Sequence, residues 1–524
     1  MTYDSIIVGA GAAGLTAAAH LAKEGHRILL LEKESQCGGL VTSFQRGGFT
    51  FDGGIRALEN AGVLFPMLKK LGIDLHFLKN QVSLGLEDYI IHIEGKDDFI
   101  AYEKLLKAFY PESSDEIADI VQDIQDITRL MDIQYGIDNP LFLDFKEDRD
   151  YFIKKVFPWM FKYAFSVTKV GSKNLPVIAY LQKFTDNEAL IDIITQHFFT
   201  ETPAYFALSY FTLYQEYVYP QNGTGEFSQK LTDFILAHGG EIRTGKTVTS
   251  IDLENHAVIT SDGETLSYRY MVWAADQKTL YQMVDSESLS AHDTIEAVRE
   301  KRAFLADKTG NDSVLTLYLM VDQDPSYFKA ISNGHFFYTP SREGLSKAGA
   351  IPRQGSREDV FAWLERFYAL TTYEISIPAL RNPDLAPPGK TGLIISTLFD
   401  YGLTRHIDDQ GWSTDFQGHL AEQMIRTLEN SIYPGLGRSV IDSFIATPIT
   451  LQKRSGSTEG AITGWSFAND VMPAESRLIR IANSVKTPLS DIFQAGQWTY
   501  SPSGFPVALI TGKLSADAVH KGLK

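Results

Sequence analysis

Cysteine is almost absent from this chain, because Cys37 is the only one among 524 residues. A single thiol cannot form an internal disulfide, a Cys-x-x-Cys redox pair or a thiolate metal cluster. Redox proteins that work through paired cysteines are therefore excluded, and we expect Cys37 to be a small packed residue. No other pattern of metal ligands stands out, so we expect no metal site.

Basic residues and long apolar runs are also scarce. Lysine and arginine number 48 against 65 acidic residues, and the net charge of −17 argues against general binding of nucleic acid. No apolar run reaches the roughly 18 residues of a transmembrane helix. The first strand is expected to begin at residue 4 or 5, which leaves no room for a signal peptide. We expect a protein that is cytoplasmic, or peripheral on the inner face of a membrane.

The start of the chain carries a glycine-rich motif between two strands. Residues 5–8 form an apolar run typical of a buried strand, residues 15–25 an alanine-rich helix, and residues 27–31 a second strand. The motif itself is Gly9-Ala10-Gly11-Ala12-Ala13-Gly14, and Glu32 ends the second strand. This order predicts an α/β fold with a Rossmann-like parallel sheet.

Each position of the motif has a physical role. Gly9 permits the tight turn from strand to helix, Gly11 lets the backbone approach a pyrophosphate, and Gly14 allows close packing of helix on strand. The helix N-terminus favours the negative charge of the phosphates. Glu32 is placed to accept hydrogen bonds from the hydroxyls of an adenosine ribose. The motif therefore predicts a bound dinucleotide.

The segment after Glu32 favours FAD over NAD. Gly38 and Gly39 offer further backbone N–H groups to an extended diphosphate, and residues 48–56 combine aromatic side chains with glycine. An NAD-binding domain with an irregular third strand is the alternative. No second glycine-rich motif is evident, so we expect no built-in NAD(P) domain.

Three parts of the sequence resemble the flavin-dependent phytoene desaturase, carotenoid isomerase and retinol saturase group of the amine oxidase superfamily. They are residues 5–56, 219–276 and 491–520. The resemblance implies a FAD-binding domain of the glutathione-reductase type. It also implies that the helix after Pro506 directs its N-terminus at the flavin, where a helix dipole stabilises the anionic reduced form. The chain departs from the family at Gln497, where aspartate is frequent.

The resemblance further implies which residues contact FAD. They are Gly9, Gly11, Ala12, Ala13, Gly14, Glu32, Lys33, Gly38, Gly39, Leu40, Gly54, Ile55, Arg56, Val248, Ala275, Gly496, Gln497, Phe505, Pro506 and Val507. Arg56 is the one candidate for a catalytic role, because it ends a segment expected near the flavin ring. It could steady anionic flavin or bind a polar end of the substrate, and a structural salt bridge is the alternative.

We expect three structural units. Residues 1–95, 221–285 and 486–524 form the FAD-binding domain, residues 286–485 an α+β substrate domain, and residues 100–220 a helical cap. Within the cap, residues 151–170 mix lysines with large aromatic side chains. Lys162 and Lys169 share one helical face, a pattern typical of a helix at a bilayer interface. Packing of the aromatic stripe inside the cap is the alternative.

The activity implied by the resemblance is desaturation, saturation or isomerisation of carbon–carbon double bonds, with hydride transfer at flavin N5. The implied substrate is an apolar polyene or isoprenoid, similar to a carotenoid or retinoid. A flavin amine oxidase and a FAD- or lipid-binding protein without turnover are the alternatives. The twelve histidines are scattered, and we expect each to be structural or solvent-exposed.

Overall fold

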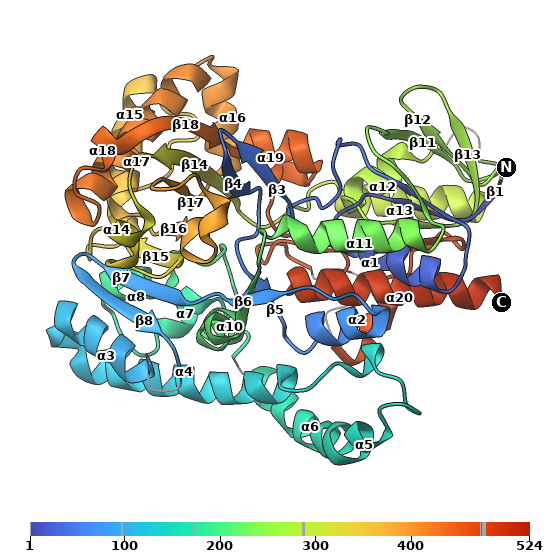
Figure 1. Cartoon of the computed structure of the whole chain (residues 1–524), viewed down its shortest axis with the longest axis horizontal. Coiled ribbons are helices and arrows are strands. Elements are labelled where there is room, and N and C mark those ends of the chain that lie inside the picture. Colours follow the sequence, from blue (N-terminus) through green and yellow to red (C-terminus); the bar gives the residue numbers. More distant parts are fainter. Residues whose placement is uncertain (1, 96–97, 172, 286–288, 472, 474–477) are drawn as a thin grey trace.

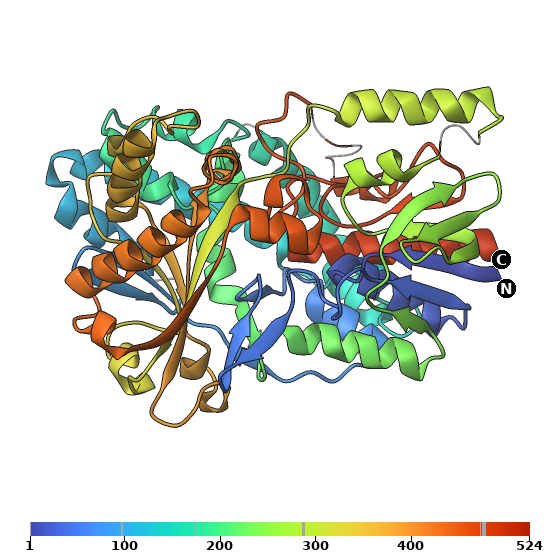
Figure 2. The ribbon, with the colours of Figure 1, turned by 90° about the horizontal axis from the view of Figure 1, so that it is seen from above.

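The computed structural model describes residues 2–95, 98–171, 173–285, 289–471, 473 and 478–524, apart from the side chains of residues 134, 164–165, 167–171 and 478–479. Two large sheets lie side by side, one near both chain termini and one at the far end of the molecule (Figures 1 and 2). The helices of residues 98–135 lie below the second sheet in Figure 1.

The first sheet is built from three distant parts of the chain. Its strand order is β10–β2–β1–β13–β12–β11, and β19 pairs with the end of β13. The strands around β1 are parallel, which confirms the predicted Rossmann-like sheet. The bounds are β1 Thr2–Val8, β2 Ile28–Leu31, β10 Glu241–Arg243, β11 Val248–Asp252, β12 Ala257–Thr260, β13 Thr265–Trp273 and β19 Ile492–Gln494.

One helix fills the centre of this unit. Helix α1 (Ala12–Lys23) is buried along almost its whole length, between α11 (Gly225–Ala237) and α20 (Phe505–Leu523). Its alanines allow this close approach. At Gly512 of α20 an added Cβ would lie 2.4 Å from the carbonyl oxygen of Ala13. The small residues of both helices are therefore what lets α20 pack directly on α1.

The second sheet has the order β18–β14–β17–β16–β15–β7–β8. All nine residues of strand β14 (Ser313–Val321), which lies between β18 and β17, are buried. Helices α15 (Arg357–Leu370) and α17 (Ser413–Ser431) pack on it. The other strands are β7 Val82–Leu86, β8 Tyr89–Ile93, β15 His335–Thr339, β16 Tyr373–Ser376, β17 Thr391–Phe399 and β18 Val440–Ala446.

Residues 82–93 lie in this second sheet, although the expected FAD-binding segment ran to residue 95. The reason is the pairing of β7 with β15, which is parallel and continuous from Val82 to Leu86. Two small sheets connect the units: β3 (Ser43–Arg46) pairs with β4 (Phe49–Asp52), and β9 (Tyr217–Pro220) lies between β5 (Leu58–Glu59) and β6 (Phe77–Lys79). The division into three domains stays a prediction.

The cap is helical, with α4 (Ser114–Tyr135) as its longest element. Isoleucines at helical spacing in α4 are buried while its acidic side faces solvent, as the spacing predicts. The other main helices are α3 Asp98–Phe109, α6 Phe157–Gly171, α7 Val177–Leu181, α8 Glu188–Thr195 and α10 Tyr210–Glu216. Across the described residues, every helix is too short or too polar to cross a membrane.

Candidate active site

Two adjoining cavities, of about 850 and 390 Å³, follow the glycine-rich motif. The larger, which we call the adenosine-side cavity, lies at the ends of β1 and β2. The smaller, the ring-side cavity, lies between the start of α20 and the second sheet. Gly11, Leu40 and Ala275 line both, so the two cavities meet where the motif turns into α1.

The adenosine-side cavity is lined by the predicted contacts at the ends of β1 and β2. The carboxylate of Glu32 is buried there and is held by two backbone N–H groups. Oε2 accepts from Ala10 at 2.7 Å, and Oε1 accepts from Glu34 at 2.9 Å. Each oxygen keeps a lone pair that a ribose hydroxyl could occupy. The predicted residues that line this cavity are Gly9, Gly11, Glu32, Lys33, Gly39, Leu40, Val248 and Ala275.

The glycines of the motif fit the roles expected of them. A Cβ at Gly14 would lie 1.9 Å from the carbonyl oxygen of Gly9, so only glycine allows this helix–strand contact. Gly9 has φ +98°, a conformation that other residues rarely adopt. At Gly11, by contrast, a Cβ would meet no protein atom within 4 Å. It would point into the cavity, in the space that a diphosphate would occupy.

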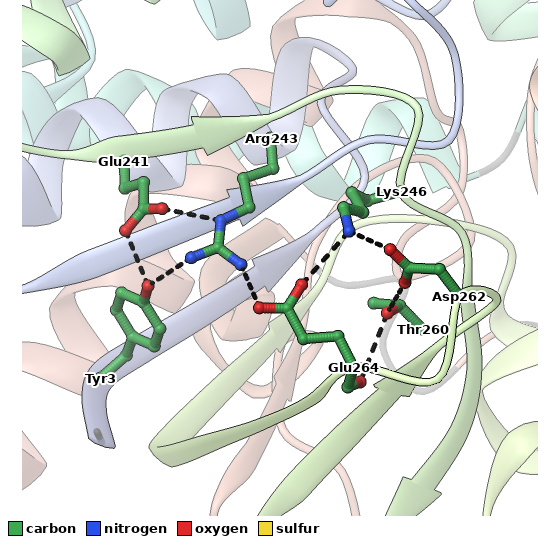
Figure 3. A network of polar contacts seen from close by, with 7 residues as sticks. All are labelled: Tyr3, Glu241, Arg243, Lys246, Thr260, Asp262 and Glu264. Carbon is green, nitrogen blue, oxygen red and sulfur yellow. Dashed lines mark hydrogen bonds and ion pairs between the residues drawn. The ribbon is translucent and has the colours of Figure 1, made fainter.

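A network of charged side chains braces the sheet beside this cavity (Figure 3). Arg243 on β10 donates to Glu241 and to Glu264, both at 2.7 Å, and to the hydroxyl of Tyr3 at 3.1 Å. Lys246 pairs with Glu264 at 3.2 Å and with Asp262, and it lines the cavity. The network thereby ties the edge strand β10 to the β12–β13 turn.

The ring-side cavity is lined by Gly38, by residues 54–56 and by predicted residues of the C-terminal segment. Gly504 and Phe505 at the start of α20 line it, and no side chain among the described residues caps this helix. The uncapped N–H groups suit a negative charge in the cavity. The predicted residues that line it are Gly11, Ala12, Ala13, Gly38, Leu40, Gly54, Ile55, Arg56, Ala275, Gly496, Gln497 and Phe505.

Three of the predicted cofactor residues line neither cavity. Gly14 lies within α1, and Pro506 and Val507 lie in the first turn of α20. The helix begins at Phe505, two residues before the start that the sequence suggested. Gly14 therefore acts through packing, and α20 meets the cavity through its first residues.

Arg56 is buried in the wall of the ring-side cavity. Its guanidinium donates to the Ser396 hydroxyl at 2.6 Å and to the Gly54 carbonyl at 3.0 Å, and lies 3.4 Å from the Glu374 carboxylate. Its Nε has no partner among the described residues. The ion pair that was one alternative for Arg56 is thus present, and a spare donor remains beside the cavity.

A hydrogen-bonded chain orients Glu374. Arg381 can only donate, so the Asn80 oxygen must face it and the Asn80 amide nitrogen must donate to Nδ1 of His335 at 3.2 Å. Burial lowers the pKa of His335, so the ring is neutral, and its Nε2 donates to Glu374 at 3.0 Å. Burial alone would raise the pKa of Glu374, but Arg56 and His335 outweigh it and bring it to about 2.

A second carboxylate, Glu59, lines the same cavity in an opposite environment. No hydrogen bond or ion pair within the described part of the chain reaches it. Burial, and then the neighbouring charge of Glu216, raise the pKa of Glu59 to about 7. The cavity therefore holds one carboxylate that is always ionised near neutral pH and one that is poised to take or release a proton.

Sequence reasoning missed Glu59, Glu374 and His335. Glu59 follows Arg56 by three residues, and this short distance was the one signal that could have found it. Glu374 and His335 lie more than 270 residues from Arg56, on strands whose pairing the sequence does not reveal. His335 lines the ring-side cavity as a buried residue that holds Glu374, which agrees with the expectation that each histidine is structural or solvent-exposed.

The arrangement defines the class of the protein. A parallel sheet with the glycine-rich turn, a buried carboxylate at the end of β2, open space past Gly11 and a helix that no described side chain caps together fit FAD. The protein is a FAD-dependent oxidoreductase.

Residues 12–520 match the model of the family described as flavin containing amine oxidoreductase, and the chain belongs to that family. It is 22% identical to the 1-hydroxycarotenoid 3,4-desaturase of Flavobacterium sp. (strain P99-3), over 98% of each chain. It is 24% identical to the chloroplastic prolycopene isomerase of Arabidopsis thaliana, over 86% of this chain and 72% of that protein. The crystal structure of an oxidoreductase from Methanosarcina mazei has the same fold, with a TM-score of 0.61, 16% identity and 98% and 99% of the two chains covered.

Proposed function

We propose that this enzyme desaturates, saturates or isomerises carbon–carbon double bonds in an apolar, carotenoid-like polyene. The observation that carries the proposal is the similarity to a carotenoid desaturase over 98% of both chains. The ring-side cavity supports it, because aromatic side chains of the cap and the second sheet form one wall. They are Phe199, Phe206, Tyr210, Tyr217 and Phe337.

FAD supplies the hydride acceptor or donor for this chemistry. The residues of the chain hold and orient the reactants: the aromatic wall offers flat apolar surfaces to a conjugated substrate. With FAD bound, the positive charge of Arg56 would steady negative charge in the ring-side cavity, which Arg56 lines together with residues 54–55 and the start of α20. Glu374 balances the charge of Arg56 and keeps the guanidinium in place.

Anaerobic mixing of the purified holoenzyme with phytoene tests the function. A desaturase loses the absorption of oxidised FAD while longer-wavelength polyene absorption appears. Enzyme reduced with dithionite and mixed with prolycopene tests isomerisation by the same optical readout, and reoxidation of the flavin by the polyene indicates saturation. Absence of change in all three experiments would rule the proposal out.

Oxidation of an amine is the second candidate, and one observation favours it. Glu59 has no cationic partner within the described part of the chain, and an ammonium group could supply one. The same anaerobic experiment with putrescine in place of the polyene decides between the two. Reduction of FAD by the amine and not by phytoene would make the enzyme an amine oxidase.

The proposal includes contact with a membrane, because a long apolar substrate does not travel freely through water. Segment 152–162 packs through Val156 and the Trp159 indole, which donates to the Ile133 carbonyl in α4. Its other face exposes Ile153, Phe157, Met160 and Phe161, the last 73% exposed. Lys154, Lys155 and Lys162 are exposed around these side chains. The side chain of Lys169 lies outside the described residues.

Sedimentation with phosphatidylserine vesicles at low salt tests this contact. The double variant Lys155→Glu, Lys162→Glu should lose binding, since each lysine contributes about 1 kcal/mol near an anionic surface. Lys230→Glu on α11 is the matched control and should sediment as wild type does. Wild-type protein that stays in the supernatant would remove the membrane from the proposal and leave the enzymatic part untouched.

A further inference from the structure

The proposed chemistry needs a group that exchanges a proton with the substrate. Desaturation breaks two C–H bonds on adjacent carbons. One hydrogen leaves with its electron pair and reduces FAD by two electrons. The other leaves as a proton, and the electron pair of its bond becomes the new π bond. Saturation requires the same proton to be delivered. The proton partner must be a titratable side chain that reaches the ring-side cavity.

Three carboxylates line that cavity, those of Glu59, Asp276 and Glu374. Asp276 caps helix α12 (Gln277–Met283), and its two oxygens accept from the backbone N–H groups of Lys278 and Thr458. Glu374 and Glu59 are therefore the candidates. Both oxygens of Glu374 are already in use, one by His335 at 3.0 Å and the other by Arg56 at 3.4 Å. A carboxylate that a guanidinium and an imidazole hold in its charged form is a poor proton acceptor. Glu374 is therefore a fixed negative charge that positions Arg56.

Glu59 differs in each respect. It ends the short strand β5, where its register partner is Tyr217 on β9, and it lines the cavity three residues after Arg56. No described side chain donates to it. We infer that Glu59 is the catalytic residue that accepts the substrate proton in desaturation and returns it in saturation, an inference that rests on the proposed function.

The surroundings of Glu59 suit this role. Within the described part of the chain, the charged group that acts on Glu59 is Glu216 at the end of α10, and Asp132 of α4 in turn acts on Glu216. The phenols of Tyr135, Tyr210 and Tyr217 face it from α4, α10 and β9 and stay neutral, because burial raises their pKa values. Arg56 is directed to Glu374 instead. Burial, and then the charge of the neighbouring Glu216 carboxylate, raise the pKa of Glu59 to about 7, near the pH at which the proton must move.

The test compares Glu59→Gln with Glu216→Gln in the holoenzyme, with phytoene as substrate. In wild type, kcat should rise with pH through an apparent pKa of about 7, because only ionised Glu59 accepts the proton. Glu59→Gln should lower kcat by roughly 10²- to 10⁴-fold, with KM nearly unchanged and the pH dependence lost. Glu59→Asp should restore part of kcat. Glu216→Gln should keep turnover and move the pH profile to lower pH, because the variant lacks the negative charge that helps to raise the pKa of Glu59.

The other possible results of this experiment are interpreted as follows. Glu59→Gln with wild-type kcat and pH profile overturns the role of Glu59 while the proposed function stands. A loss confined to KM makes Glu59 a binding residue, as an amine substrate would require. Wild-type enzyme that converts no polyene ends the proposed function and this inference together. The visible spectrum of bound FAD reports folding of every variant.

Discussion

Both cavities are bordered by networks of charged side chains, but the two networks differ in how far their side chains are buried. The network of Figure 3 is partly exposed: the Arg243 side chain is 27% exposed and its partners Glu241 and Glu264 are more so. The Arg56–Glu374–His335 cluster is largely buried, with Arg56 at 7%. Solvent screens the first network more than the second, because Arg56 and His335 are buried although the Glu374 side chain is 28% exposed. The first network can brace a sheet edge, whereas the second can hold charge against a cofactor.

The largest effect should follow from breaking the buried cluster. Arg56→Ala leaves the Glu374 carboxylate without its guanidinium, and an uncompensated buried charge costs about 3–5 kcal/mol of unfolding free energy. Urea unfolding of apoprotein measures it. The double variant Arg56→Met, Glu374→Leu removes both charges and should recover much of the loss; equal losses in both proteins would mean that the pair is not coupled.

The next effect is the dependence of stability on pH that Glu374 in the ring-side cavity should cause. The pKa of Glu374 is about 2, below its unfolded value of 4.5, so ionised Glu374 stabilises the fold above pH 4.5. That contribution, up to about 3 kcal/mol, falls away as the pH drops from 4.5 to 2. Unfolding of wild type and Glu374→Gln at a series of pH values should show two curves that converge in acid. Curves that stay parallel would contradict this assignment.

At the adenosine end, Glu32→Ala should weaken FAD binding by roughly ten- to hundredfold, or about 1–3 kcal/mol. The reason is that both the ribose hydroxyls and the Ala10 N–H lose their acceptor in a partly desolvated site. Fluorescence titration of apoprotein with FAD gives the affinity. Glu300→Ala, an exposed carboxylate on α13 (His292–Leu305), is the control and should bind FAD as wild type does.

The smallest effect should come from the network of Figure 3. Arg243→Ala removes pairs that solvent already screens, so the free energy of unfolding should fall by about 1 kcal/mol or less. Raising the salt concentration should shrink the difference between variant and wild type further. A loss as large as that of Arg56→Ala, or one that salt does not reduce, would show that the two networks are energetically alike.

The difference between the two cavities also explains which features of the protein could be predicted from its sequence. The glycine-rich turn, α1 and Glu32 lie within about 25 consecutive residues, and each has a local conformational reason for its residue type. The isoleucine spacing of α4 likewise predicts which face is buried. Elements of this kind were predicted with their type and place, although α20 begins two residues before the expected start.

The ring-side cavity could not be predicted in this way. The segment at residues 82–93 has no local feature that assigns it to the second sheet; only the pairing of β7 with β15 does. That sheet brings His335 and Glu374 to Arg56, and the pairing of β5 with β9 brings Glu59 beside Tyr217. None of these contacts leaves a periodic pattern in the chain, so glutamates and histidines with opposite roles look alike in the sequence.

The sequence by itself determined the cofactor class and the parallel sheet that holds FAD, because a phosphate-binding turn depends on backbone conformation and on contacts between near neighbours in the chain. Only the tertiary structure decided the chemistry of the ring-side cavity. A carboxyl group takes its proton affinity from burial and from the charges around it. For Glu59 and Glu374 those surroundings come from strands and helices that are distant in sequence and meet only when the chain is folded.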